Sequence, residues 1–245
     1  MGHPCRISLP QQPVGLGAHG QGDAASGIAV SMISDYVDLA AGEESFIGAK
    51  LKWARLISLA RLFETNKIRI FAGNRPSGSA TEQDWETCTG YVRELARTAA
   101  EYGIYTIIET HPNTFADGLA STLRLIRQTE HDFLGINLDI LHLWEAGCEP
   151  LAAMRELEPW TMNYHLKNVR SRDKLQVFDP SNVYSPSGSR EGMVSLAEGA
   201  VDFVPVIRAL RQARYAHSAS LEWFGQEPYR FLRNELQWLL KLTDD

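Results

Sequence analysis

The sequence predicts an α/β protein of the TIM (β/α)8-barrel type, and three observations support that prediction. From Gly27 onward, short apolar runs alternate with longer segments of helical period, which is typical of βα units around a parallel sheet. Several of the apolar runs end in an acidic residue or a histidine. The chain has 245 residues, 44% of them apolar, which suits one barrel domain with a substantial core.

Six apolar runs have the length and composition of buried parallel strands. Each is short and apolar almost throughout, as expected where both faces of a strand are covered. The predicted strands are residues 28–34, 67–72, 104–109, 134–139, 162–167 and 218–223. Because parallel strands need crossover connections, their C-terminal ends should all lie on one face of the sheet.

Segments of 3.6-residue period fill the intervals between these strands. In residues 82–102, for example, Trp85 and Val92 lie on one apolar stripe. Thr81 is the expected N-cap of this helix, and Gly103 is its expected C′ residue. The other predicted helices are residues 44–65, 119–129, 149–157, 202–214 and 227–241.

Two stretches do not follow the alternation. Residues 168–201 form a long polar connection after a strand that contains a histidine, and long connections in compact domains usually serve a function, so we expect an active-site loop. Residues 1–26 are rich in proline and glycine and do not resemble a βα unit. We therefore expect a single barrel domain over residues 27–245 and a divergent, poorly ordered head in place of the first one or two βα units.

Charge and cysteine usage narrow the class of protein. A formal net charge of −6 argues against a nucleic-acid partner, because such binding needs a basic face. The cysteines, Cys5, Cys88 and Cys148, match neither a disulfide framework nor a thiolate metal site. No apolar run is long enough to cross a membrane. We expect a cytoplasmic enzyme that acts on a small molecule, with a homo-oligomer left open.

Four residues with side chains that bind metals stand at the ends of predicted strands: Glu109, Asp139, His165 and Glu222. One such residue is more often a cap of the following helix, but four in succession should converge at one end of a parallel sheet. Carboxylates with an imidazole suit Mn²⁺, Mg²⁺, Co²⁺ or Zn²⁺. The sequence therefore predicts a metalloenzyme.

Bases and cations lie close to these residues in the sequence. His111 follows Glu109 by two positions, Lys167 follows His165 by two, and Arg69 interrupts an apolar strand. His142 follows Asp139 by three. A metal beside such groups suits removal of a proton next to a carbonyl, with stabilisation of the enolate. The alternative is structural: Arg69 and Lys167 could pair with carboxylates, and His142 could be a core histidine.

Aromatic residues in the connections complete the predicted site. Each lies in or near a loop that should surround the metal, where a ring can form a wall and a tyrosine hydroxyl can donate to a substrate. They are Tyr36, Phe178, Tyr184 and Phe224.

Several of these segments together resemble the bacterial 3-dehydroshikimate dehydratases of the siderophore-pathway type, which are xylose-isomerase-like TIM barrels. The resemblance runs from about residue 28 to about residue 240. The most specific segments are ETHPNT, LHLWEAG and SLEWFG, supported by SMISDYVDL, ETNKIRIFAG, NYHLKNV and VFDPSNVY.

The resemblance implies a hydro-lyase that converts 3-dehydroshikimate to protocatechuate (3,4-dihydroxybenzoate) through an enolate, with a divalent metal, Mn²⁺ first and Mg²⁺ or Co²⁺ as alternatives. It assigns the metal to Glu109, Asp139, His165 and Glu222, and the base to His111. Tyr184 and Lys167 would assist catalysis. Positions that would contact the substrate are Tyr36, Arg69, His142, Lys167, Phe178, Tyr184 and Phe224. The pathway would be siderophore biosynthesis or the metabolism of aromatic compounds.

Two other functions are compatible with the same residues. A keto-sugar isomerase or epimerase of this fold would use the same metal and enolate chemistry, but would not form an aromatic product. An inactive, N-terminally truncated remnant is the second alternative, because the head does not reproduce the first βα units.

Overall fold

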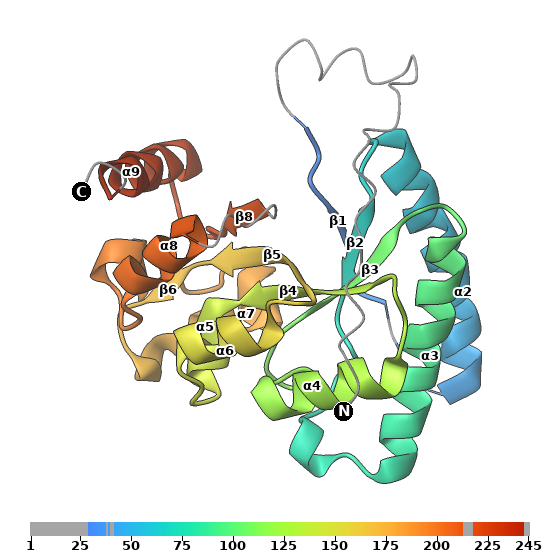
Figure 1. Cartoon of the computed structure of the whole chain (residues 1–245). Coiled ribbons are helices and arrows are strands. Elements are labelled where there is room, and N and C mark those ends of the chain that lie inside the picture. The colour runs from blue at the N-terminus through green and yellow to red at the C-terminus, as the bar shows by residue number, and fades with distance from the viewer. Residues whose placement is uncertain (1–28, 38, 40–41, 213–217, 243–245) are drawn as a thin grey trace.

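A six-stranded parallel sheet, curved into an open half-barrel, is the frame of the protein (Figure 1). The computed structural model describes residues 29–37, 39, 42–212 and 218–242. The strand order is β1-β2-β3-β4-β5-β8, and every neighbouring pair is parallel. The strands are β1 (Ile33–Ser34), β2 (Lys67–Ile70), β3 (Tyr105–Glu109), β4 (Leu134–Asp139), β5 (Thr161–Leu166) and β8 (Ser218–Leu221). The fold predicted from the sequence is confirmed.

Helices cover the outer face of this sheet, as the βα alternation predicts (Figure 1). The predicted helices are α2 (Gly42–Leu62), α3 (Glu82–Ala100), α4 (Leu119–Thr129), α6 (Pro150–Leu157), α8 (Phe203–Gln212) and α9 (Pro228–Lys241). The largest difference among the strands is at the first, where residues 29–32 make no strand and only Ile33–Ser34 pair with β2. The predicted head, residues 1–26, lies outside the described residues.

The ends of α3 show how local chemistry sets a boundary. Thr81 Oγ1 accepts a hydrogen bond from Asp84 N at 3.2 Å, and Asp84 Oδ2 accepts one from Thr81 N at 2.9 Å. This reciprocal capping box confirms Thr81 as the N-cap. The helix ends earlier than predicted, with Glu101 as C-cap, so Gly103 lies one residue beyond the C′ position. Gly103 nevertheless has the left-handed φ of +68° that favours glycine.

A short helix that the sequence pattern did not predict, α5 (Ile140–Glu145), follows β4 directly. Asp139 Oδ1 accepts a hydrogen bond from His142 N at 3.1 Å and thereby caps the helix. Six residues are too few to show a helical period within an apolar run. Asp139 therefore caps a helix with one oxygen and keeps the other for the end of the sheet.

The long connection at residues 168–201 folds into short elements, which are β6 (Asn168–Val169), η2 (Arg172–Phe178), α7 (Pro180–Val183), β7 (Met193–Val194) and η3 (Leu196–Glu198). β6 and β7 pair antiparallel. The buried side chain of Asn168 donates to Leu196 O and Val201 O, at 2.9 Å each. These bonds satisfy carbonyls near the end of the connection and join that end to its beginning at β6.

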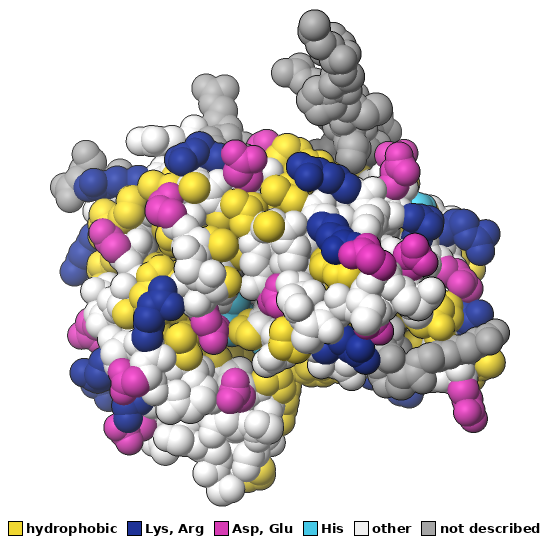
Figure 2. Space-filling view, turned by 90° about the horizontal axis from the view of Figure 1, so that it is seen from below, with side chains coloured by type: hydrophobic (Ala, Val, Ile, Leu, Met, Phe, Trp, Pro, Cys, Tyr) yellow, Lys and Arg dark blue, Asp and Glu magenta, His cyan; other side chains and the backbone are white. Residues whose placement is uncertain are grey.

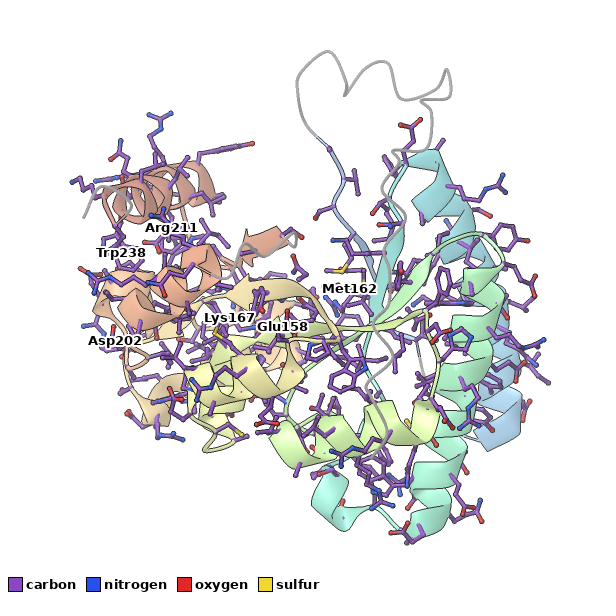
Figure 3. The ribbon with its side chains drawn as sticks, viewed as in Figure 1. Glu158, Met162, Lys167, Asp202, Arg211 and Trp238 are labelled. Atoms are coloured by element: carbon purple, nitrogen blue, oxygen red, sulfur yellow. The ribbon has the colours of Figure 1, made fainter. Side chains whose placement is uncertain are left out.

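The layers pack through apolar side chains. The surface carries both positively and negatively charged side chains (Figure 2). Trp53 and Trp85 are buried in the core, as their helical spacing predicted. Trp238 and Arg211 lie where α9 packs on α8 (Figure 3), and Arg211 donates to Leu239 O at 2.8 Å. Figure 2 shows lysines and arginines interspersed with acidic residues over one face. Within the described residues, no helix combines the length and apolarity that a membrane span requires.

Thr81→Ala should destabilise the protein by about 1 kcal/mol, because the capping box loses its hydroxyl acceptor. Urea unfolding monitored by circular dichroism measures the change. The matched control is Thr87→Ala, because Thr87 lies on the same helix and its exposed hydroxyl bonds only within that helix, to Gln83. Equal stability of the Thr81→Ala variant and wild type would show that the cap contributes nothing.

Candidate metal centre

The four predicted ligands meet at the C-terminal ends of the strands. Glu109 and Asp139 are the last residues of β3 and β4, His165 lies in β5, and Glu222 follows β8. The strand register places Asp139 beside His165. One ligand atom from each of the four residues lies within 4.8 Å of the others. The parallel sheet therefore brings together side chains that are up to 113 positions apart in the sequence, Glu109 and Glu222.

A polar network lies beneath these residues on the inner face of the sheet. Asn163 Nδ2 donates to Asn137 Oδ1 at 2.7 Å, and Asn163 Oδ1 accepts from Ser218 Oγ at 2.6 Å and Ser220 Oγ at 3.3 Å. These residues precede the candidate ligands by two or more positions on the same strands, so they share the inward direction. The network ties β4, β5 and β8 together directly below the site.

Two permanent cations lie against the carboxylates. Arg69 Nε is 2.9 Å from Glu109 Oε2. Lys167, labelled in Figure 3, extends from the end of β5, and its Nζ is 2.7 Å from Asp139 Oδ2 and 2.5 Å from Glu222 Oε2. Both cations are buried. Arg69 and Lys167 do pair with carboxylates, as the structural alternative from the sequence predicted. Both residues therefore stabilise the charges of the cluster, in addition to any role in catalysis.

The protonation states follow from these contacts. Burial alone would raise the pKa of Glu109, but the charges of His165 and Arg69 outweigh it and hold that pKa well below its usual range. Burial would likewise lower the pKa of Lys167, but Asp139 and the other carboxylates outweigh it and raise that pKa. Glu109 and Lys167 are therefore both charged at neutral pH.

The donor set fits a divalent cation. Three carboxylates face two permanent cations, so with His165 neutral, the state that binds a metal, the cluster has an excess of negative charge. Within the described residues, Glu109 Oε2 and Asp139 Oδ2 accept no hydrogen bond of good geometry, although a cation lies near each. His165 Nδ1 lies 3.2, 3.9 and 3.7 Å from oxygens of Glu109, Asp139 and Glu222. Hard oxygens with one imidazole suit Mn²⁺, Mg²⁺, Co²⁺ or Zn²⁺.

His111 lies beside this cluster, and within the described residues only one of its ring nitrogens makes a hydrogen bond. Its Nδ1 lies 2.8 Å from Pro112 O, and since a carbonyl only accepts, Nδ1 carries the hydrogen and Nε2 is left with a lone pair. Burial lowers the pKa of His111. The ring packs 4.6 Å from Phe71 and 4.5 Å from His142, centroid to centroid. A neutral, oriented imidazole of this kind can accept a proton.

His142 lies behind His111. Its Nδ1 is 3.0 Å from Glu145 Oε2, whereas its Nε2 is buried, without a hydrogen-bond partner in the described part of the chain, and 3.8 Å from Asp139 Oδ2. Burial, with a contribution from Lys167, lowers the pKa of His142 to about 3. His142 is not among the residues that line the crevice described below. Its predicted contact with substrate stays a prediction.

A crevice of about 30 Å³ opens onto the cluster. It is lined by Tyr36, Arg69, Phe71, Glu109, His111, Lys167, Phe178, Pro180, Val183, Tyr184, Glu222 and Phe224. A hollow of about 400 Å³ adjoins it and shares Tyr36, Phe71, His111 and Pro180. His111 therefore borders both spaces, and the larger one has room for a small organic molecule.

The predicted aromatic residues surround this crevice. The Tyr36 hydroxyl donates to the Tyr184 hydroxyl at 3.0 Å across the mouth, and burial together with that bond raises the pKa of Tyr36. Phe178 and Phe224 meet edge to face, with ring centroids 6.5 Å apart. The connection at residues 168–201 thus contributes walls to the site, as the sequence predicted.

Three lining residues were not singled out from the sequence: Phe71, Pro180 and Val183. Phe71 had a usable signal, because it follows Arg69 by two positions and strand alternation points both side chains the same way. Pro180 and Val183 belong to α7, and only the folding of the long connection brings them over the sheet. No sequence spacing marks them.

Residues 23–242 match the xylose isomerase-like TIM barrel family, and the chain belongs to that family. It is 41% identical to a 3-dehydroshikimate dehydratase of Bacillus anthracis over 210 residues, which are 86% of this chain and 74% of the relative. The chain is a homologue of that dehydratase, whose reaction class is that of a hydro-lyase.

Solved structures agree with this assignment. The crystal structure of a probable 3-DHS dehydratase involved in petrobactin synthesis from Bacillus anthracis superposes with a TM-score of 0.83 at 41% identity, covering 86% of this chain and 76% of that chain. A xylose isomerase-like TIM barrel protein from Mycobacterium smegmatis in complex with magnesium gives a TM-score of 0.66 at 20% identity, covering 89% and 74%. The second likeness shows the fold alone.

Glu222→Gln should weaken Mn²⁺ binding by about tenfold or more, because the amide keeps the shape of the side chain and removes one negative charge. Isothermal titration calorimetry on the folded variant measures the dissociation constant. Glu86→Gln, at an exposed position of α3, is the matched control. Unchanged Mn²⁺ affinity in Glu222→Gln would remove Glu222 from the candidate ligands.

Lys167→Met should strengthen Mn²⁺ binding even though it removes a residue of the site. The ammonium contacts two of the candidate ligand oxygens, so it repels a bound cation and competes for those oxygens. About 1.4 kcal/mol of relieved repulsion corresponds to a tenfold change in affinity. The same titration measures it, with Lys241→Met, at an exposed position of α9, as control. Weaker binding in Lys167→Met would show that Lys167 supports the metal site.

Proposed function

We propose that the protein catalyses the metal-dependent dehydration of 3-dehydroshikimate to protocatechuate. The proposal rests mainly on one observation: a largely buried cluster of three carboxylates and one histidine lies beside a neutral histidine, His111, whose Nε2 carries a lone pair. The 41% identity to a 3-dehydroshikimate dehydratase supports the choice of substrate. The similar crystal structure is of a probable 3-DHS dehydratase involved in petrobactin synthesis, which supports siderophore biosynthesis as the pathway.

The metal would be held by Glu109, Asp139, His165 and Glu222, with Mn²⁺ as the first choice and Mg²⁺ or Co²⁺ as alternatives. When bound, the ion supplies positive charge that favours negative charge on a carbonyl oxygen of the substrate. The three carboxylates would hold it at the strand ends.

His111 would begin the reaction as general base. Its Nε2 carries the lone pair, because Nδ1 donates to Pro112 O. It would take the proton from the carbon next to the substrate ketone, which leaves negative charge on the ketone oxygen as an enolate. The ring borders both the crevice and the larger hollow, so a substrate in the hollow can reach it.

Lys167 and Arg69 would stabilise that negative charge. Both side chains line the crevice and both carry positive charge in a buried setting, where a charge interaction is stronger than in water. Arg69 offers the planar donor pair that also matches a carboxylate. The substrate carries a carboxylate and develops an enolate, so these cations suit both groups.

Loss of the β-hydroxyl would complete the dehydration. The carbon–oxygen bond breaks, a carbon–carbon double bond forms, and a proton from His111 or the Tyr184 hydroxyl leaves with the hydroxyl as water. Proton shifts within the ring then give the aromatic product. Tyr36, His142, Phe178 and Phe224 would contact the substrate around these groups.

Purified protein with Mn²⁺ and 3-dehydroshikimate should form protocatechuate, detected by its near-ultraviolet absorbance and by mass. His111→Ala should lower kcat by about 10²- to 10⁴-fold, the usual contribution of a general base, while Mn²⁺ affinity stays near the wild-type value. His131→Ala, a histidine outside the crevice, is the control. No aromatic product from folded wild-type protein would exclude the proposed reaction, and near-full activity of His111→Ala would exclude His111 as the base.

A further inference from the structure

We propose that Arg190 is a positioning residue for this reaction. It joins the segment that carries Tyr184 to the chain that follows Glu222, and so sets the two sides of the crevice relative to each other. Arg190 does not line the crevice itself. The contacts of Arg190 are those of the structure, whereas their effect on catalysis rests on the proposed function.

The guanidinium of Arg190 donates to carbonyls on both sides of the crevice. On one side, Nη2 donates to Val183 O at 2.8 Å and Nη1 to Asn182 O at 3.0 Å. On the other side, Nε donates to Phe224 O at 2.8 Å. Val183 and Phe224 both line the crevice. One side chain thus bridges two walls whose residues are 41 positions apart in the sequence.

No acidic residue in the described part of the chain forms an ion pair with Arg190. All of its hydrogen bonds go to backbone carbonyls, including longer ones to Ser189 at 3.3 Å and Ser185 at 3.4 Å. A planar guanidinium offers five donors in a fixed fork that can serve several separated carbonyls, whereas an ammonium offers three donors on a single atom. The residue type therefore matches a backbone clamp better than a charge partner.

Asn182 and Gly188 complete this arrangement. We call Asn182, Gly188 and Arg190 together the Arg190 clamp. Asn182 Nδ2 donates to Val177 O and Ser189 O at 2.8 Å each, and Asn182 Oδ1 accepts from Ser189 N at 2.9 Å. A Cβ atom at Gly188 would lie 2.0 Å from Asn182 O, so only glycine fits without a shift. The segment from Val177 to Arg190 is closed on itself by these bonds.

Tyr184 depends on the clamp for its position. Its side chain is 62% exposed and packs edge to face on Tyr36, with ring centroids 5.7 Å apart, so the core does not fix its position. Its hydroxyl nevertheless meets the Tyr36 hydroxyl at 3.0 Å. The backbone on either side of it is held by Arg190, through Val183 O and Ser185 O. Loss of Arg190 would free this backbone and move both Tyr184 and Phe224 relative to the candidate ligand Glu222.

Arg190→Ala should lower kcat/KM for 3-dehydroshikimate by between about ten- and a hundredfold, because small displacements of groups around a substrate have effects of this size. Arg190→Lys should recover only part of the loss, since an ammonium cannot reach both sides equally. Arg208→Ala, which removes an exposed arginine from α8, is the matched control and should behave as wild type. An Arg190→Ala variant within twofold of wild type would overturn the proposal.

A double-mutant cycle separates positioning from general loss of stability. If Arg190 acts through Tyr184, Arg190→Ala should cost much less in a Tyr184→Ala background than in wild type. Equal losses in both backgrounds would show that Arg190 does not act through Tyr184 and would overturn that part of the proposal. Urea unfolding of each variant establishes that the proteins compared are folded.

Amide hydrogen exchange gives a readout that needs no activity. Tyr184 N bonds to Pro180 O at 3.1 Å and Ser189 N to Asn182 Oδ1 at 2.9 Å, so both amides should be protected. Their exchange should accelerate in Arg190→Ala and stay unchanged in Arg208→Ala. Unchanged exchange in Arg190→Ala would refute the clamp. If exchange accelerates in Arg190→Ala but the wild-type protein does not dehydrate 3-dehydroshikimate, the clamp is supported and only the proposed function is refuted.

Discussion

The gathering of three carboxylates at one end of the sheet, two of them buried and Glu222 half-buried, is the constraint on which the site depends. Buried charges are costly unless they are paired, so Glu109, Asp139 and Glu222 require cations within a few ångströms. Arg69 and Lys167 supply them at 2.9 Å or less. The remaining excess of negative charge suits a divalent ion, which would join the same network. Pairing and metal binding are therefore linked: each cation that stabilises the carboxylates also weakens their hold on a metal.

Residues at the strand ends serve fold and site together. Asp139 caps α5 through one oxygen and faces the cluster with the other. Asn163 joins neighbouring strands through hydrogen bonds directly below the candidate ligands. In the connection after β5, the side chain of Asn168 donates hydrogen bonds to two backbone carbonyls of the same connection. The connection also places aromatic walls over the sheet. The positions of the candidate ligands thus depend on backbone and amide contacts, including the helix cap that Asp139 makes itself.

Much of the fold followed from period and alternation in the sequence. Buried parallel strands and amphipathic helices leave strong patterns, and their predicted ranges differ from the observed ones by a few residues, most of all at β1. The short helix α5 left no pattern, since six residues are too few to show a helical period. The candidate ligands were predicted because a parallel sheet collects strand ends. Arg190 was not predicted, because its partners are carbonyls, which every residue has and which no sequence marks.

The sequence by itself determined the class of fold, the family resemblance and the set of residues that meet at the candidate metal centre. These depend on side-chain type at regular positions, and such information is local. Only the tertiary structure decided which atoms face one another: that His111 keeps Nε2 free, that His142 stands behind it, and that Lys167 lies between Asp139 and Glu222. It also decided that one arginine bridges two walls of the crevice. Such contacts depend on distances between segments far apart in the chain, and spacing along the sequence carries no information about them.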